Sequence, residues 1–124
     1  MKYVLMFADT QDPALALPDD VAQDVYQRMY GWFEEHGSAG RIVETGAELQ
    51  PVATATTVRS GEGDKPVVVD GPFAETKEVI GGFTVIDVED MDAAIAMART
   101  WPALEHPGHS VEIRPMVVDY SQFE

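Results

Sequence analysis

The chain contains no cysteine among its 124 residues. A disulfide framework and a metal site built on thiolates are therefore both excluded. Basic residues are scarce as well: eight Lys and Arg stand against 22 Asp and Glu, which gives a formal net charge of −14. Such a surface repels phosphate backbones and anionic lipid headgroups. We therefore expect neither nucleic acid nor a membrane as a partner.

Long apolar runs are also missing. The first one extends only from Tyr3 to Ala8, which is too short for a signal peptide or for the ~20 residues of a membrane span. We expect a soluble, cytoplasmic protein. Its composition, with 45% apolar and 24% charged residues, is that of an ordinary globular protein, and its length fits a single domain over 1–124.

Glycine and proline divide the chain into short segments with a clear period. Apolar residues recur at helical spacing in 19–36 and 89–101, which predicts two helices. Short β-branched or alternating segments predict strands at 2–8, 40–49, 53–60, 65–70, 81–88 and 110–118. One extra strand aside, this order is the split βαβ arrangement of the ferredoxin-like fold. We predict an α+β protein with an antiparallel sheet and two main helices on one face.

The face of that sheet away from the helices is predicted to be apolar too. Segment 2–8 has apolar residues at both parities, as a strand covered on both faces would. Two helices on one face leave the other uncovered, and an uncovered apolar face would form a large exposed patch. We therefore predict a homodimer in which two sheets face each other. The glycine pair at 81–82 predicts a bulge or a close approach of backbone.

A nine-residue motif, "DGPFAETKE", occupies 70–78. Together with "ATATTVR" before it, "GGFTVIDVEDMDAAIAMA" after it and "SVEIRPM" near the end, it resembles the DGPF family within the YCII-related group. The resemblance covers nearly the whole chain. It implies a dimeric α+β barrel, which agrees with the predicted order of elements.

The resemblance also implies two kinds of function. The YCII-related group is similar to small enzymes that act on aromatic-ring breakdown products, and a His–Asp pair has been suggested as its active site. Asp70 stands where the motif places its acid. The histidine of the pair is expected after the first strand, where this chain has none before His36, so we infer His109 as the partner of Asp70. Some DGPF proteins are instead associated with extracytoplasmic-function sigma factors, which implies a role in signalling.

Asp70 has two interpretations. As a catalytic carboxylate it would act as a general base or orient a histidine. As a turn residue it would accept the backbone N–H of Phe73 or Ala74, since Asp-Gly-Pro is good turn chemistry without any ligand.

The histidines, like Asp70, have either a functional or a structural interpretation. His109 follows His106 in "HPGH", but the Pro-Gly between them fixes no geometry and no third ligand follows, so no metal site is expected. An unperturbed histidine titrates near ~6.5 and suits proton transfer, whereas a loop histidine is otherwise solvated or bonded to backbone. His36 ends the first predicted helix, where a cation suits the helix dipole. No phosphate-cradling loop is present, and no cofactor is expected.

Four further residues are candidates for ligand binding. Arg59 and Arg114 lie within predicted strands and would either hold an anionic substrate or pair with Glu48 and Glu112 across strands. Phe73 and Lys77 belong to the motif. Phe73 would either line a pocket or pack in the core. Lys77 would either bind a carboxylated substrate or pair with a neighbouring carboxylate.

Two functions therefore stay open. The first is a small cofactor-free enzyme that uses Asp70 and His109 for acid–base chemistry on a carboxylated or aromatic metabolite in the barrel cavity. The second is a non-catalytic ligand- or partner-binding module in signalling. The enzyme requires a cavity in which an acid and a base converge, whereas the module requires only an exposed recognition loop.

Overall fold

The computed structural model describes residues 1–72 and 78–123, so most of the DGPF motif after Pro72 lies outside the described residues. The main elements, in chain order, are β1 (Lys2–Thr10), α1 (Asp19–Ser38), β2 (Ile42–Glu48), β3 (Thr56–Arg59), β4 (Val67–Asp70), β5 (Glu78–Asp87), α2 (Met91–Ala98) and β6 (Ser110–Pro115). Each predicted helix and strand forms. Of the helices described, none is long and apolar enough to cross a bilayer.

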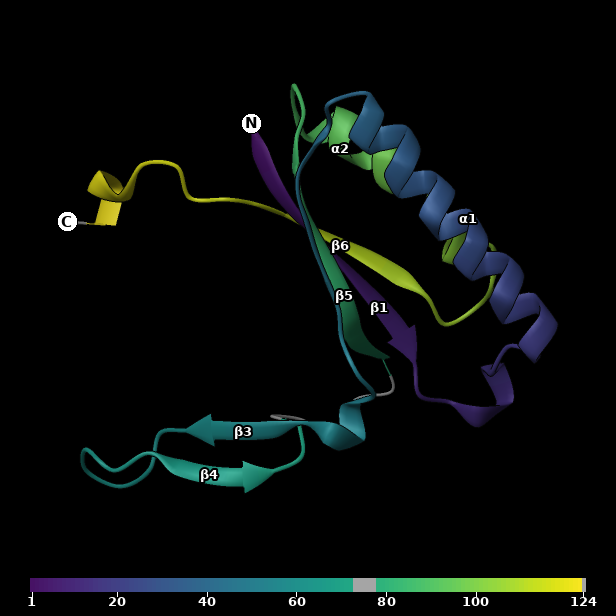
Figure 1. The fold of residues 1–124 in the computed structure, drawn as a ribbon. Helices are drawn as coiled ribbons and strands as arrows, with labels where there is room; N and C mark the ends of the chain where they lie inside the picture. Colours follow the sequence, from purple (N-terminus) through teal and green to yellow (C-terminus); the bar gives the residue numbers. More distant parts are fainter. Residues whose placement is uncertain (73–77, 124) are drawn as a thin grey trace.

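The main sheet has four strands in the order β2-β5-β1-β6, and every neighbouring pair is antiparallel. Both helices lie on one face of this sheet (Figure 1). This is the ferredoxin-like arrangement, and the predicted fold class is confirmed. β3 and β4 form a separate two-stranded sheet that projects away from the main sheet (Figure 1).

The core lies between the main sheet and the helices. Tyr3, Leu5 and Phe7 alternate toward the helices along β1 and are buried. They pack in one cluster with Trp32 of α1 and Trp101, which follows α2. The period-2 pattern of the strand and the helical spacing of α1 therefore meet in a single apolar layer.

His36 is part of this buried layer. Its side chain is only 6% exposed and its ring lies 4.6 Å from that of Trp32. Nδ1 lies 2.9 Å from Nη1 of Arg41, so it accepts the guanidinium proton. Burial lowers the pKa of His36, and the charge of Arg41 lowers it further. The interpretation of His36 as a cation at the helix end is therefore wrong, because neighbouring elements bury it in the neutral form.

The opposite face of the main sheet carries half-buried apolar side chains such as Val4, Met6 and Val85. The β3–β4 hairpin is also apolar and exposed: Val58 and Val68, which face each other across it, are 65% and 67% exposed. An isolated two-stranded hairpin is only marginally stable in water. These surfaces are the ones that the predicted homodimer would cover.

Candidate functional site

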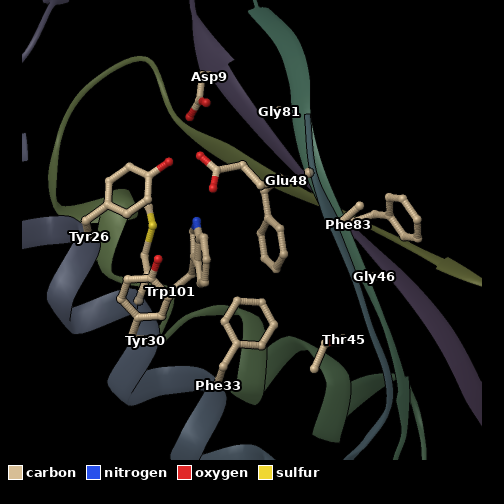
Figure 2. Close-up of a pocket in the computed structure, with 14 residues that line it drawn as sticks. Asp9, Tyr26, Tyr30, Phe33, Thr45, Gly46, Glu48, Gly81, Phe83 and Trp101 are labelled. Atoms are coloured by element: carbon tan, nitrogen blue, oxygen red, sulfur yellow. The ribbon is translucent and has the colours of Figure 1, made fainter. Parts of the chain in front are cut away.

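A cavity of about 370 Å³ lies between α1 and the ends of β1, β2 and β5. Six aromatic residues line it: Phe7, Tyr26, Tyr30, Phe33, Phe83 and Trp101 (Figure 2). Small-molecule sites are concave, mostly apolar and of about this size or larger. The cavity is suited to a molecule with a single ring.

The floor of the cavity is built from stacked rings. Phe7 and Trp101 stack at a centroid distance of 4.0 Å with an angle of 18° between their planes, and Phe33 meets Trp101 edge-on at 5.8 Å. α1 adds Tyr26 and Tyr30, which lie one turn apart and are exposed. Aromatic side chains prefer to pack against further rings in these two geometries, so a planar ligand would continue the stack.

Two carboxylates lie at the mouth of the cavity. Asp9 lies near the end of β1 and Glu48 ends β2, and both line the cavity. Their carboxylates and the hydroxyl of Tyr26 gather on one side of it (Figure 2). Among the described residues that line the cavity, none is lysine, arginine or histidine. The polar end of this cavity is therefore acidic.

Asp9 also contacts His109. Nε2 of His109 lies 3.6 Å from Oδ1 of Asp9, and the imidazole is largely buried. Nδ1 of the same ring lies 3.2 Å from the carbonyl oxygen of His106. If Nδ1 donates its proton to that carbonyl, Nε2 faces the carboxylate, and the two groups form an ion pair when the ring is protonated. Burial raises the pKa of Asp9, and the positive charge of His109 partly offsets this.

The strand register brings the two residues together. Ala8 pairs with Ser110 at the last rung of β1 and β6, so the next residues outward, Asp9 and His109, become neighbours. Gly108 has φ +86°, and a Cβ there would come within 2.6 Å of the Cβ of Thr10. Only glycine allows this close approach, which fixes the loop before His109 against β1.

The β3–β4 hairpin carries Asp70, the predicted catalytic acid. Asp70 ends β4, pairs with Thr56 and is exposed. The structure therefore brings His109 to Asp9 and leaves Asp70 on the projecting hairpin. The turn after Asp70 is held by the backbone of Gly71, whose N–H donates to the carbonyl of Ala55 at 2.8 Å. The predicted bonds from Asp70 to residues 73 and 74 lie outside the described residues.

The four predicted ligand-binding residues lie elsewhere. Arg59 is on β3, and Arg114 is on the sheet face away from the helices, opposite Val4. Neither lines the cavity, and within the described part of the chain neither forms an ion pair with a carboxylate. Phe73 and Lys77 lie outside the described residues.

Asp9 itself was not predicted. It lies directly after the first predicted strand, where Asp, Thr and Pro cluster in a pattern typical of a turn, and such a pattern does not single out one carboxylate. The available signal was its position, directly after the strand where the YCII resemblance expects one member of the His–Asp pair. Within residues 1–72 and 78–123, no group of three or more acidic, histidine or cysteine side chains is placed to hold a metal ion.

The sequence is similar to known proteins. The family model of the YCII-related domain matches residues 1–117. An uncharacterised protein of Rhizobium meliloti is 37% identical over 86 residues, which cover 69% of this chain and 65% of the relative, so the match spans less than two thirds of the relative's length.

A solved structure has a similar fold. It is 5-chloro-2-hydroxyhydroquinone dehydrochlorinase from Burkholderia phenoliruptrix AC1100, in complex with 2,5-dihydroxybenzoquinone. The TM-score is 0.52, and the match covers 94% of each chain at 14% sequence identity. At this identity the likeness shows the fold alone.

Proposed function

The chain belongs to the YCII-related domain family, and from this premise we propose that its cavity binds a small aromatic molecule on which Asp9, paired with His109, performs proton transfer. The observation that carries this proposal is the position of Asp9. Its carboxylate lines the aromatic cavity and at the same time contacts a buried imidazole. No described carboxylate apart from Asp9 combines these two contacts.

The electrostatics of Asp9 suit acid–base chemistry. A general acid or base works best when its pKa is shifted toward the working pH, and burial raises the pKa of Asp9 in that direction. His109 does not line the cavity, so Asp9 is the group that meets the ligand. His109 is the positioning partner: it orients the carboxylate and exchanges a proton with it.

The size and the walls of the cavity support an aromatic ligand. About 370 Å³ accommodates one ring, and the stacked pair of Phe7 and Trp101 offers a flat surface for it. The dehydrochlorinase of similar fold is complexed with a one-ring dihydroxybenzoquinone, which supports the same ligand class here. We assign the chain to the DGPF branch on its motif at 70–78.

We also propose that the protein is a homodimer, since the sheet face away from the helices and the hairpin valines Val58 and Val68 are left uncovered. The signalling module remains the second candidate function. It is favoured by the same projecting hairpin, at whose end Asp70 begins the DGPF motif that contains Phe73 and Lys77 in the sequence. A cytoplasmic location and an anion-binding role for Arg59 or Arg114 also remain proposals.

The proposed function is tested by isotope exchange, because this readout needs no knowledge of the natural product. One-ring phenols and quinones are first screened for quenching of tryptophan fluorescence, since Trp101 forms the floor of the cavity. Those that bind are then incubated with the protein in D₂O, and the loss of ring proton signals is followed by NMR.

We expect the wild-type chain to accelerate exchange in at least one bound compound and Asp9→Asn to slow that exchange by roughly 100-fold or more, the range for loss of a general base. Asp64→Asn, which removes an exposed carboxylate from the β3–β4 connection, is the matched control and should exchange at the wild-type rate. Equal exchange by the wild type and Asp9→Asn would overturn the proposal. Binding without exchange would favour the non-catalytic module.

A further inference from the structure

We propose that the cavity selects its ligand by charge, and that Glu48 is the residue that sets this selection: it admits an uncharged aromatic ring with hydroxyl groups and rejects a ring with a carboxylate. This inference rests on the proposed function, because it concerns the same cavity. It assigns a role to a residue that takes no part in the Asp9–His109 pair.

The first observation is the set of polar groups at the cavity mouth. Glu48 and Asp9 come from two different strands, and their carboxylates gather beside the hydroxyl of Tyr26 (Figure 2). An ionised carboxylate only accepts hydrogen bonds. A ligand therefore has to bring donors to this end of the cavity. Ring hydroxyls are such donors, whereas a ligand carboxylate brings only further acceptors.

The second observation is that nothing described neutralises Glu48. Arg28 is engaged by Asp24 and Glu105, at 3.2 Å and 2.7 Å, and Arg41 by the buried His36. Within the described ranges, no ion pair involves Glu48, and no basic side chain lines the cavity. His109 faces Asp9 and not Glu48 in the ion pairs of the described residues.

The two carboxylates differ in what they can do. The imidazole of His109 partly offsets the cost of burying the Asp9 carboxylate, and burial raises the pKa of Asp9. Asp9 can therefore hold a proton. Glu48, at the end of β2, has no ion-pair partner among the described residues and acts on a ligand through its charge and its lone pairs. A like charge placed a few ångströms from it in a half-enclosed cavity costs roughly tenfold in affinity, the scale expected between bulk water and a buried site.

The sequence leaves both a carboxylated and an aromatic metabolite open. The composition of the cavity favours the second class and weakens the binding of the first. Arg59 and Arg114, which were the candidate anion-binding residues, do not line it. A protein with a net charge of −14 also repels anions before they reach the cavity. The charge of Glu48 and the net charge of the protein therefore both disfavour an anionic ligand.

The test compares two probes of similar size, catechol and benzoate, by calorimetric titration against the wild-type chain and Glu48→Gln. We expect the wild type to bind catechol and to bind benzoate at least tenfold more weakly. Glu48→Gln, which keeps an acceptor oxygen but removes the charge, should tighten benzoate binding by roughly tenfold and change catechol binding by less than threefold. Glu62→Gln, at an exposed position in the β3–β4 connection, should leave both dissociation constants unchanged.

A ratio of the two dissociation constants that is the same in wild type and Glu48→Gln would overturn charge selection by Glu48. The result of the exchange experiment with Asp9→Asn would not be affected, so each proposal can be rejected independently of the other. If the wild-type chain binds neither catechol nor any other one-ring phenol, the aromatic cavity function fails and this inference fails with it. Circular dichroism of Glu48→Gln establishes that the variant is folded.

Discussion

The carboxylate of Asp9 occupies the space beside Gly81 that any larger residue would fill: a Cβ at residue 81 would come within 2.7 Å of Oδ2 of Asp9. The register of β1 and β5 explains this contact. Phe7 pairs with Gly82 and Ala8 with Ile80, so Gly81 is the extra residue of a bulge. The bulge that the glycine pair predicts is confirmed, and it makes room for the carboxylate.

Gly81→Ala therefore tests the position of Asp9 without removing its charge. The atom that a new methyl group would meet is the end of a flexible side chain, so we expect the fold to tolerate the substitution and the carboxylate to rotate away from His109. The thermal midpoint should change by roughly 3 °C or less, while isotope exchange falls at least about tenfold, the scale of a misplaced catalytic group.

Gly31→Ala is the matched control, because a Cβ at that helical position meets nothing within 4 Å. It should keep the wild-type exchange rate and the wild-type thermal midpoint. A Gly81→Ala variant that exchanges at the wild-type rate would show that the position of the Asp9 carboxylate does not matter.

Asp9→Asn is expected to stabilise the protein at neutral pH. Burial raises the pKa of Asp9 above its ordinary value of 3.8, so the folded state retains a proton that the unfolded chain has already released. The ionised form is thus penalised in the folded state at pH values above the folded pKa, and the penalty disappears below about 3.8. Asparagine removes the penalty.

The gain should be only a few tenths of a kcal/mol, because the Asp9 side chain is 54% exposed and solvent screens it. Calorimetry at pH 7.5 should show a thermal midpoint about 1–2 °C above wild type, and no difference near pH 3.5. A lower midpoint at pH 7.5 would mean that attraction to His109 outweighs the burial of Asp9.

The stability of the protein should also depend on His36. Its folded pKa lies below 6.5 because the ring is buried, so on acidification the unfolded chain takes up a proton first. The contribution of His36 to stability is fully present above about pH 6.5 and is lost as the pH falls from there through the folded pKa. Nδ1 accepts from Arg41, so the neutral ring carries its proton on Nε2, and an added proton would have to lie on Nδ1 against the guanidinium.

We expect the thermal midpoint of the wild type to fall by a few degrees between pH 7.5 and pH 5. His36→Gln should have a lower thermal midpoint than the wild type at pH 7.5, but its midpoint should fall less on acidification. His106→Gln, which alters a histidine that is not fully buried, should keep the wild-type pH dependence. Equal pH dependence in all three proteins would contradict the assignment to His36.

These histidines also show which parts of the structure local sequence patterns could predict. The short apolar segment of β1 and the helical spacing along α1 predicted the elements and the fold class, because both patterns reflect burial against one common layer. His36 was misassigned because its burial depends on Arg41 and Trp32. Asp9 was missed because its role depends on His109, which is 100 positions away in the chain and becomes its neighbour only through the β1–β6 register.

The β3–β4 hairpin gives the test of the proposed dimer. Val58 and Val68 pair directly and are the most exposed valines of the hairpin. Exposed apolar strand residues of this kind occur where another surface covers them, and the proposed partner is a second copy of the chain. Charges at these two positions would be buried in the dimer interface, which costs far more than leaving them in water.

We therefore expect the wild type to sediment as a dimer and Val58→Lys/Val68→Lys to sediment as a monomer at the same concentration. The exposed hairpin of a monomer tolerates lysine at these positions, so the variant should still fold. Gln27→Lys, at an exposed position on α1, adds a positive charge elsewhere and should remain dimeric. A wild-type chain that is monomeric at high micromolar concentration would rule out the dimer, whereas a double variant that stays dimeric would leave the main-sheet face as the surface that joins the two copies.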